Sequence, residues 1–319
     1  MEPTPPKTRS GRGLALKTAF LLSGLAVLST TTGVVGPEGA GAAAPHHAVL
    51  DVVAAENFWG NIASQLGGKD VSVTSLITNP NADPHLFETD AADAAKLAEA
   101  RVVIENGADY DTWMKSLLGA DSGHPAVVTA ATVLHVGGSD PNPHLWYDIP
   151  RVPEVAAAIA AAFSKADPRD SATFHANLQH FDSSLAPLTA TLTTIRHKYA
   201  KAPVAYTERV PGYALAAANL SVKTPTGFAR SVEDGVDPSP ADTLAMEELL
   251  TKHKIDVLLY NVQTVTSVTT QIRALAKRSG VPIVGVSETM PAGARSYQQW
   301  QQSQLKALLR ALEHSPPTT

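Results

Sequence analysis

Residues 169–199 read RDSATFHANLQHFDSSLAPLTATLTTIRHKY, and this stretch decides how the rest of the chain is organised. Apolar side chains recur in it every three or four residues, which is the period of one face of an α-helix. They are Phe174, Leu178, Phe181, Leu185, Leu188, Leu192 and Ile195. The spacing predicts one amphipathic helix, about 45 Å long if straight. Pro187 lies inside it and should kink it or split it into two shorter helices.

On each side of this stretch, β-rich runs alternate with helical patterns. Before it, the patterns predict strands at 47–54, 71–77, 101–104 and 126–129, and helices at 56–66, 91–100, 110–118 and 152–165. After it, they predict strands at 204–207, 220–223, 255–261 and 281–287, and helices at 211–218, 240–252, 265–279 and 297–313. Ser239 and Pro240 suit a helix start, and Gly280 suits a helix end.

The alternation predicts an α/β fold with two lobes. We expect each lobe to contain a roughly four-stranded, mainly parallel sheet flanked by helices, and the long helix to join the two lobes. The expected boundaries are 46–168 for the N-terminal lobe, 169–199 for the connecting helix and 200–314 for the C-terminal lobe.

The first 45 residues differ in kind from the rest. Four basic residues precede a short apolar run at 19–28, and a stretch of small residues follows at 39–44. This layout is typical of a secretory signal peptide, here 1–44, with a cleavage site after Ala42 or nearby. If the apolar run extends through Val35, an uncleaved membrane anchor is the alternative. We therefore expect an exported protein that is periplasmic, extracellular or associated with the cell surface.

The composition narrows the classes of partner and of site. The chain of 319 residues is 44% hydrophobic and 17% charged, with a net charge of −5, which gives no reason to expect nucleic acid as a partner. It contains no cysteine, so we expect neither disulfides nor a lipid attached at cysteine. A metal site would have to be built from histidine, carboxylate and neutral oxygen ligands.

One four-residue phrase occurs twice, as Pro84-His85-Leu86-Phe87 and as Pro143-His144-Leu145-Trp146. Asp83 precedes the first copy and Asn142 the second. Proline fixes φ and removes a backbone donor, and an Asx residue before it favours a tight turn. Each histidine should therefore sit on a rigid corner, and two rigidly presented imidazoles suit a metal site.

Four polar residues follow predicted strands, where the loops of an open α/β sheet converge on a ligand. His85 and His144 follow strands of the first lobe, while Glu208 and Glu288 follow the first and last strands of the second. Two neutral imidazoles and two carboxylates suit a divalent first-row metal ion. The alternatives are turn histidines bonded to nearby backbone, a surface Glu208 paired with Arg209, and a helix-capping Glu288.

Several neighbouring residues could support such a site. Asp83, Asn142 and Asp148 are candidates to orient an imidazole, and Trp146 and Phe87 could wall the site from water. Asn261 and Gln263 also follow a strand and could contact the site, but a structural turn is the favoured interpretation.

These motifs, taken in order, resemble the metal-binding solute-binding proteins of zinc and manganese ABC importers. The resemblance spans about residues 48 to 313, and it rests on Asp83-Pro84-His85 with Phe87-Glu88, Asn106-Gly107 with Trp113, Pro143-His144-Leu145-Trp146, and Tyr297-Gln298-Gln299-Trp300. It implies two α/β lobes joined by a rigid helix, with one metal ion held in the cleft. The partners it implies are a membrane permease and its cytoplasmic ATPase.

The resemblance also implies which residues bind the ion. His85 and His144 match the two histidines of the first lobe, and Glu208 takes a place where many zinc binders have histidine and many manganese binders glutamate. Glu288 stands where aspartate is usual, which keeps the carboxylate and lengthens its reach.

The identity of the ion stays open between Zn²⁺ and Mn²⁺. Two potentially bidentate carboxylates favour manganese, whereas zinc binds more tightly than manganese to almost any such site. The chain is expected to be a monomeric carrier and not an enzyme. A secreted metal-dependent hydrolase is one alternative, although no H-E-x-x-H signature is present, and a solute-binding protein for a non-metal ligand is another.

Overall fold

The structure is a computed structural model that describes residues 49–79 and 87–315. These residues belong to one compact unit, His47–Thr319. The predicted signal peptide at 1–44 lies outside the described residues, and so do Asp83 and His85. No helix within the described ranges combines the length and the apolar character needed to cross a membrane.

The first lobe contains a four-stranded parallel sheet in the order β2-β1-β3-β4. Its strands are β1 (Leu50–Glu56), β2 (Val71–Ile77), β3 (Val102–Glu105) and β4 (Ala126–Thr129). Helices α1 (Asn57–Gly67) and α5 (Val152–Ala166) pack on the face that carries Val52 and Ala54. Helices α2 (Ala91–Glu99) and α3 (Thr112–Ala120) cover the opposite face, which carries Val53 and Ala55. Successive apolar residues of β1 therefore serve two layers of helices.

The second lobe repeats this construction, with a parallel sheet in the order β6-β5-β7-β8. Its strands are β5 (Pro203–Tyr206), β6 (Ser221–Val222), β7 (Val257–Asn261) and β8 (Ile283–Val286). One face packs with α8 (Gly212–Ala217) and α12 (Tyr297–His314), and the other with α9 (Thr226–Glu233), α10 (Pro240–Thr251) and α11 (Ser267–Arg278). The predicted fold class of two parallel α/β lobes is confirmed.

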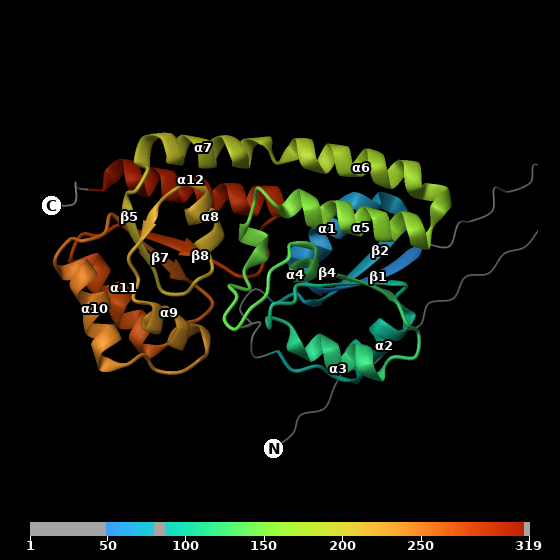
Figure 1. Ribbon diagram of the computed structural model, residues 1–319, viewed down its shortest axis with the longest axis horizontal. Coiled ribbons are helices and arrows are strands. Elements are labelled where there is room, and N and C mark those ends of the chain that lie inside the picture. The colour runs from blue at the N-terminus through green and yellow to red at the C-terminus, as the bar shows by residue number, and fades with distance from the viewer. Residues whose placement is uncertain (1–48, 80–86, 316–319) are drawn as a thin grey trace, which may run out of the picture. The chain divides into compact units, whose positions relative to one another are not determined.

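The stretch that links the lobes forms two helices, α6 (Ser171–Ser184) and α7 (Ala186–Tyr199), with Leu185 between them (Figure 1). Pro187 lies in the first turn of α7, where its missing N–H leaves no bond unmade. Helix α6 packs against α1 and α5 of the first lobe, and α7 packs against α12 of the second. The chain thus divides into two helices where it passes from one lobe to the other, which is the second of the two arrangements that the sequence allowed.

The predicted helix ends are confirmed at two places. The hydroxyl of Ser239 accepts a hydrogen bond from the amide of Asp242 at 3.1 Å, which caps α10. Gly280, which follows the C-cap residue Ser279 of α11, has a left-handed φ of 70°. The sequence missed helix α9 and the short α4 (Ala130–Val133). The described residues also include the 3₁₀ turns η1 (Gly68–Asp70), η3 (Leu145–Tyr147) and η4 (Pro168–Asp170).

Candidate metal centre

His144 lies on a rigid corner directly before η3, and its side chain is fully buried. The Asn142 side-chain oxygen accepts the backbone N–H of His144 at 3.2 Å and lies 2.7 Å from its Nδ1. The other end of that amide, Nδ2, donates to the carbonyl of Arg209 at 3.1 Å, which fixes the amide's orientation. Because Asn142 Oδ1 can only accept, Nδ1 of His144 carries the hydrogen. With the hydrogen on Nδ1, Nε2 is the ring nitrogen whose lone pair can bind a metal.

The two predicted carboxylates of the second lobe are also buried. Glu208 is 1% exposed and Glu288 0%. The Nε2 atom of His144 lies 3.7 Å from Oε2 of Glu288, so side chains of the two lobes meet here. The hydroxyl of Tyr110, in the first lobe, donates to the same oxygen at 2.9 Å. The structure thus brings His144 and Glu288 together, although they are far apart in the sequence.

Asn261 ends strand β7 and lies between the two glutamates. Its Nδ2 donates to Oε1 of Glu288 at 2.7 Å and also to Oε2 of Glu208. Gln263 holds the backbone of the same loop, because its Oε1 accepts the amides of Glu288 at 2.5 Å and Thr289 at 2.9 Å. The sequence favoured a structural turn for Asn261 and Gln263. Asn261 does make such a turn, because its Oδ1 accepts the amide of Gln263 at 3.1 Å, and its Nδ2 contacts both carboxylates as well.

The sheet order explains the position of Asn261. Strand β7 pairs with β5 on one side and β8 on the other, so the residue at its carboxyl end lies between those that follow β5 and β8. Glu208 and Glu288 are each the second residue after the end of β5 and β8. Both sheets have the same strand order, in which the third strand lies between the first and the fourth. This order was the signal that could have placed Asn261 between Glu208 and Glu288.

An ion-pair network links the lobes beside these residues. The guanidinium of Arg209 forms two 2.7 Å hydrogen bonds with Glu233 and lies 2.9 Å from the carboxylate of Asp140 in the first lobe. Arg230 also pairs with Asp140. The alternative in which Glu208 pairs with Arg209 is therefore not what the structure shows. Instead, Arg209, the residue after Glu208, contacts the first-lobe loop that carries Asn142 and His144.

Trp146 and Phe87, the two aromatic residues predicted to shield the site from water, lie in different parts of the first lobe. Trp146 is fully buried, its ring centroid lies 5.4 Å from that of His144, and it stacks on Phe58 at 3.9 Å. Phe87 instead packs against Trp113 at 4.8 Å, in the cluster on the opposite face of the sheet. The backbone carbonyl of Asp148 accepts two amides at the start of α5, whereas the bond to Nδ1 of His144 comes from Asn142. Trp146 and Asn142 are thus the predicted supporting residues that the structure places beside His144.

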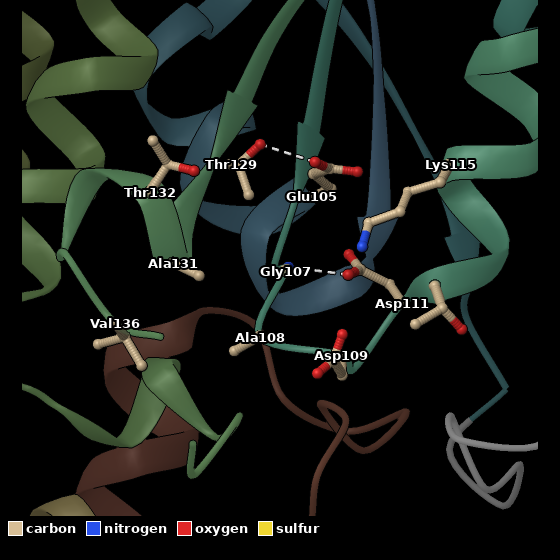
Figure 2. A pocket seen from close by; sticks show the side chains of 11 residues that line it. Glu105, Gly107, Ala108, Asp109, Asp111, Lys115, Thr129, Ala131, Thr132 and Val136 are labelled. Carbon is tan, nitrogen blue, oxygen red and sulfur yellow. Dashed lines mark hydrogen bonds between the residues drawn. The ribbon is translucent and has the colours of Figure 1, made fainter. Parts of the chain in front are cut away.

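A polar cavity of about 300 Å³ lies next to this region, with Glu105, Asp111 and Lys115 in its lining (Figure 2). The Asp111 carboxylate accepts the amides of Asn106 at 2.6 Å and Gly107 at 2.8 Å. Burial, together with the charge of Glu105, raises the pKa of Asp111 from 3.8 to about 6. The Asn106 side chain in turn donates to the carbonyl of Pro143 at 2.8 Å, directly before His144. This buried acidic turn therefore supports the corner that carries the imidazole.

The three predicted ligands that are described do not form a closed metal shell by themselves. Within residues 49–79 and 87–315, no group of three His, Cys, Asp or Glu side chains has the spacing of a complete metal site. His85, predicted as a fourth ligand, and Asp83 lie outside these ranges. The described part of the site consists of His144, Glu208 and Glu288, held by Asn142, Asn261 and Tyr110.

Comparison with known proteins identifies the family to which this chain belongs. The model of the family described as zinc-uptake complex component A, periplasmic, matches residues 52–311. The chain belongs to this family. The manganese-binding lipoprotein MntA of Bacillus subtilis is 32% identical to this family member over 157 residues. The match covers 47% of this chain and 50% of MntA. A putative metal-binding protein of Treponema pallidum is 25% identical over 232 residues, or 66% of this chain and 71% of the relative.

Solved structures share the fold of this family member. The periplasmic zinc-binding protein TroA of Treponema pallidum superposes with a TM-score of 0.72 at 19% identity, covering 83% of this chain and 99% of TroA. FpvC of Pseudomonas aeruginosa in complex with Mn²⁺ superposes with a TM-score of 0.71 at 21% identity, covering 83% and 99%. At these identities the likeness supports the two-lobe fold alone.

Proposed function

We propose that this protein captures one divalent transition-metal ion between its two lobes and delivers it to an ABC importer. One observation carries the proposal. The Nε2 atom of His144, with its lone pair fixed by the bond from Nδ1 to Asn142, lies 3.7 Å from a carboxylate oxygen of the opposite lobe. An ion bound to both atoms would join the two lobes directly.

The charges at the site suit a cation. Glu208 and Glu288 are both buried, and both lie within hydrogen-bonding distance of a single amide nitrogen. Two carboxylates in a poorly hydrated environment repel each other, and a divalent ion removes that cost. Imidazole nitrogen with carboxylate oxygen is a donor set for first-row transition metals. His85 remains the predicted further ligand.

The comparisons support the same class of function. The family is described as a zinc-uptake component, and the relatives include a manganese-binding lipoprotein and a manganese ABC transporter substrate-binding lipoprotein. From these we infer an exported, monomeric carrier whose partners are a membrane permease and a cytoplasmic ATPase. The partners would drive transport, so we expect the carrier itself to catalyse no reaction.

A calorimetric titration of chelator-treated mature protein with Zn²⁺ and with Mn²⁺ tests the proposal. We expect one ion per chain in the wild type and loss of that binding in His144→Ala. The matched control is His197→Ala, because His197 is an exposed histidine on α7. An assay with generic ester and peptide substrates in the presence of the bound ion should show no turnover.

Two results would contradict the proposal. One is a wild-type protein that binds neither ion after chelator treatment. The other is metal-dependent hydrolysis that disappears in His144→Ala, since that would make the site catalytic and the chain a hydrolase.

A further inference from the structure

The turn that carries Tyr110 has an unusual backbone conformation. Gly107, Ala108 and Asp109, which lie in the turn labelled in Figure 2, have left-handed φ angles of 74°, 54° and 63°. Two of the three carry a Cβ atom, for which this conformation is unfavourable. The carboxylate of Asp111 stabilises the turn by accepting the amide of Gly107 at 2.8 Å. Such strained backbone persists only where the surrounding structure holds it, and it is concentrated at functional sites.

This turn places the side chain of Tyr110 against predicted ligands of both lobes. Tyr110 is 2% exposed, and its ring centroid lies 5.9 Å from that of His144. Its hydroxyl donates to Oε2 of Glu288 at 2.9 Å, and the same oxygen lies 3.7 Å from Nε2 of His144. Tyr110 therefore holds Oε2 of Glu288 beside the imidazole through a bond between protein atoms alone.

The bond is compatible with metal binding at the same oxygen. A carboxylate oxygen has two lone pairs, so Oε2 of Glu288 can accept the Tyr110 hydrogen with one and bind an ion with the other. The tyrosine hydroxyl is neutral and adds no charge that would repel a cation. Tyr110 therefore need not let go of Glu288 when an ion binds.

The bond joins groups that belong to different lobes. Glu288 is held on the second lobe, because Asn261 donates to its Oε1 at 2.7 Å and Gln263 Oε1 accepts its backbone amide at 2.5 Å. Tyr110 belongs to the first lobe. When the lobes move apart, the bond from Tyr110 to Glu288 must therefore break.

An ion bound at this site could leave only after such a movement. His144 and Glu288 are 0% exposed and Glu208 is 1% exposed, so the predicted ligands are closed off from solvent. Release thus requires the lobes to separate, and the bond from Tyr110 opposes that separation. Capture starts from an open protein, in which the bond is already broken. The bond should therefore affect release more than capture.

We propose that Tyr110 is a positioning residue, which holds Glu288 of the second lobe against the first lobe and so slows the release of the bound ion. This rests on the proposed function, because it concerns the ion that the site would hold. Tyr110 acts through Glu288 and does not itself bind the ion.

Stopped-flow release of Zn²⁺ from the mature protein into a chelating dye tests the inference. Tyr110→Phe removes the hydroxyl and keeps the ring, so the variant should fold. We expect it to release Zn²⁺ about tenfold faster or more, because a hydrogen bond to a charged group is lost. The rate of Zn²⁺ capture should stay within about twofold of the wild type.

Glu288→Asp supplies the second arm of the test. It keeps the charge but shortens the side chain by one methylene group, so the carboxylate no longer reaches the Tyr110 hydroxyl. Tyr110→Phe should then change the release rate by less than about twofold, because two residues that act through one bond are not additive. A merely structural role of Tyr110 would give the same factor in both backgrounds, which would contradict the inference.

The same double-mutant cycle can be measured without an ion. Urea unfolding of chelator-treated protein should show that Tyr110→Phe and Glu288→Asp are coupled, because the bond consists of protein atoms alone. This arm keeps the test available if Glu288→Asp does not hold Zn²⁺, and additive effects on unfolding would then overturn the inference.

Tyr147→Phe is the matched control. The Tyr147 hydroxyl is also buried near Glu288, where it bonds the carbonyl of Ser287 at 2.7 Å and the side chain of Gln304 at 2.8 Å rather than the carboxylate. Its effect on release should be the same in the wild type and in Glu288→Asp. If Tyr147→Phe coupled to Glu288→Asp as strongly as Tyr110→Phe does, the effect would be general loosening and the inference would be wrong.

The remaining outcomes separate the inference from the proposed function. Unchanged release in Tyr110→Phe, from a protein that binds one Zn²⁺, would overturn the role of Tyr110 and leave metal capture intact. Slower capture with unchanged release would do the same. Failure of the wild type to bind either Zn²⁺ or Mn²⁺ would overturn the proposed function and with it the effect on release.

Discussion

The two lobes place their site residues by different means. In the first lobe, His144 sits on a corner formed by Pro143 and held by Asn142, all within three consecutive positions. In the second, Glu208 and Glu288 follow strands far apart in the sequence, and Asn261 joins them only because β7 lies between β5 and β8. A local motif can therefore be found by reading along the chain. A side chain placed by sheet order becomes visible only in three dimensions.

The largest expected difference between the lobes concerns the ligands themselves. His144→Ala removes a nitrogen ligand outright, and we expect metal affinity to fall by about a thousandfold or more, or about 4 kcal/mol. Glu208→Gln keeps an oxygen in place but removes a charge, so its loss should be smaller. Calorimetric titration of both variants measures the two losses. A larger loss in Glu208→Gln would reverse the ranking.

The pH dependence of stability should come from the acidic turn of the first lobe. The pKa of Asp111 is raised to about 6, so the folded state binds a proton more tightly than the unfolded state. The contribution of Asp111 to stability should therefore be fully present below about pH 4 and be lost as the pH rises through about 6, by up to about 3 kcal/mol. Urea unfolding of metal-free protein across this range measures the loss.

Glu105→Gln sharpens this prediction. The charge of Glu105 helps to raise the pKa of Asp111, so the variant should show a smaller loss over the same pH range. Its bond from the Thr129 hydroxyl, 2.6 Å in the wild type, can form with the amide oxygen too. An unchanged or steeper pH dependence would show that the two carboxyl groups are not coupled.

Removing the residue that orients His144 should have an intermediate effect. Asn142→Ala frees Nδ1 of the imidazole and should weaken metal binding by roughly 10- to 100-fold, as is typical when the hydrogen-bond partner of a ligand is lost. Asn142→Asp retains an acceptor for Nδ1 and should retain more affinity. Equal affinities in Asn142→Ala and the wild type would mean that the corner alone positions His144.

The smallest effect should come from the ion pairs between the lobes. Asp140 is about half exposed, so its pairs with Arg209 and Arg230 should contribute at most about 1 kcal/mol. We expect Asp140→Asn to speed metal release a few-fold at low salt and less at high salt.

Asp234→Asn is the matched control for this contact, because Asp234 pairs with Arg230 within the second lobe. Stopped-flow release into a chelator would measure both variants. Equal rates in Asp140→Asn and Asp234→Asn would show that the contact between the lobes does not hold the ion.

Much of the fold was predictable because the local patterns are strong. The eight strands found in residues 49–79 and 87–315 were all predicted, since buried parallel strands read as short β-rich runs between helical patterns. Helix α9 was missed because its eight residues follow Pro225 and end before Gly235, so the segment resembles a loop. Phe228 and Val232 form part of a buried cluster of the second lobe, and this packing supports a helix that the local pattern did not indicate.

At the site, the residues close to His144 in the sequence were predictable, and those that reach the site from distant parts of the chain were less so. Asn142 and Trp146 lie next to His144 in the sequence, and the structure places both beside its ring. Tyr110 and Asn261 reach Glu288 from distant parts of the chain. The sequence assigned Tyr110 no role at the site, and for Asn261 it favoured a structural turn over contact with the site.

The measurement that tests the central claim most directly is a metal titration of chelator-treated protein alongside a variant that carries His144→Ala, Glu208→Gln and Glu288→Gln together. We predict one tightly bound divalent ion per wild-type chain and no tight binding in the triple variant, with both proteins folded by circular dichroism. Equal binding in the two proteins, or none in the wild type, would contradict the claim that the protein carries its metal between these residues.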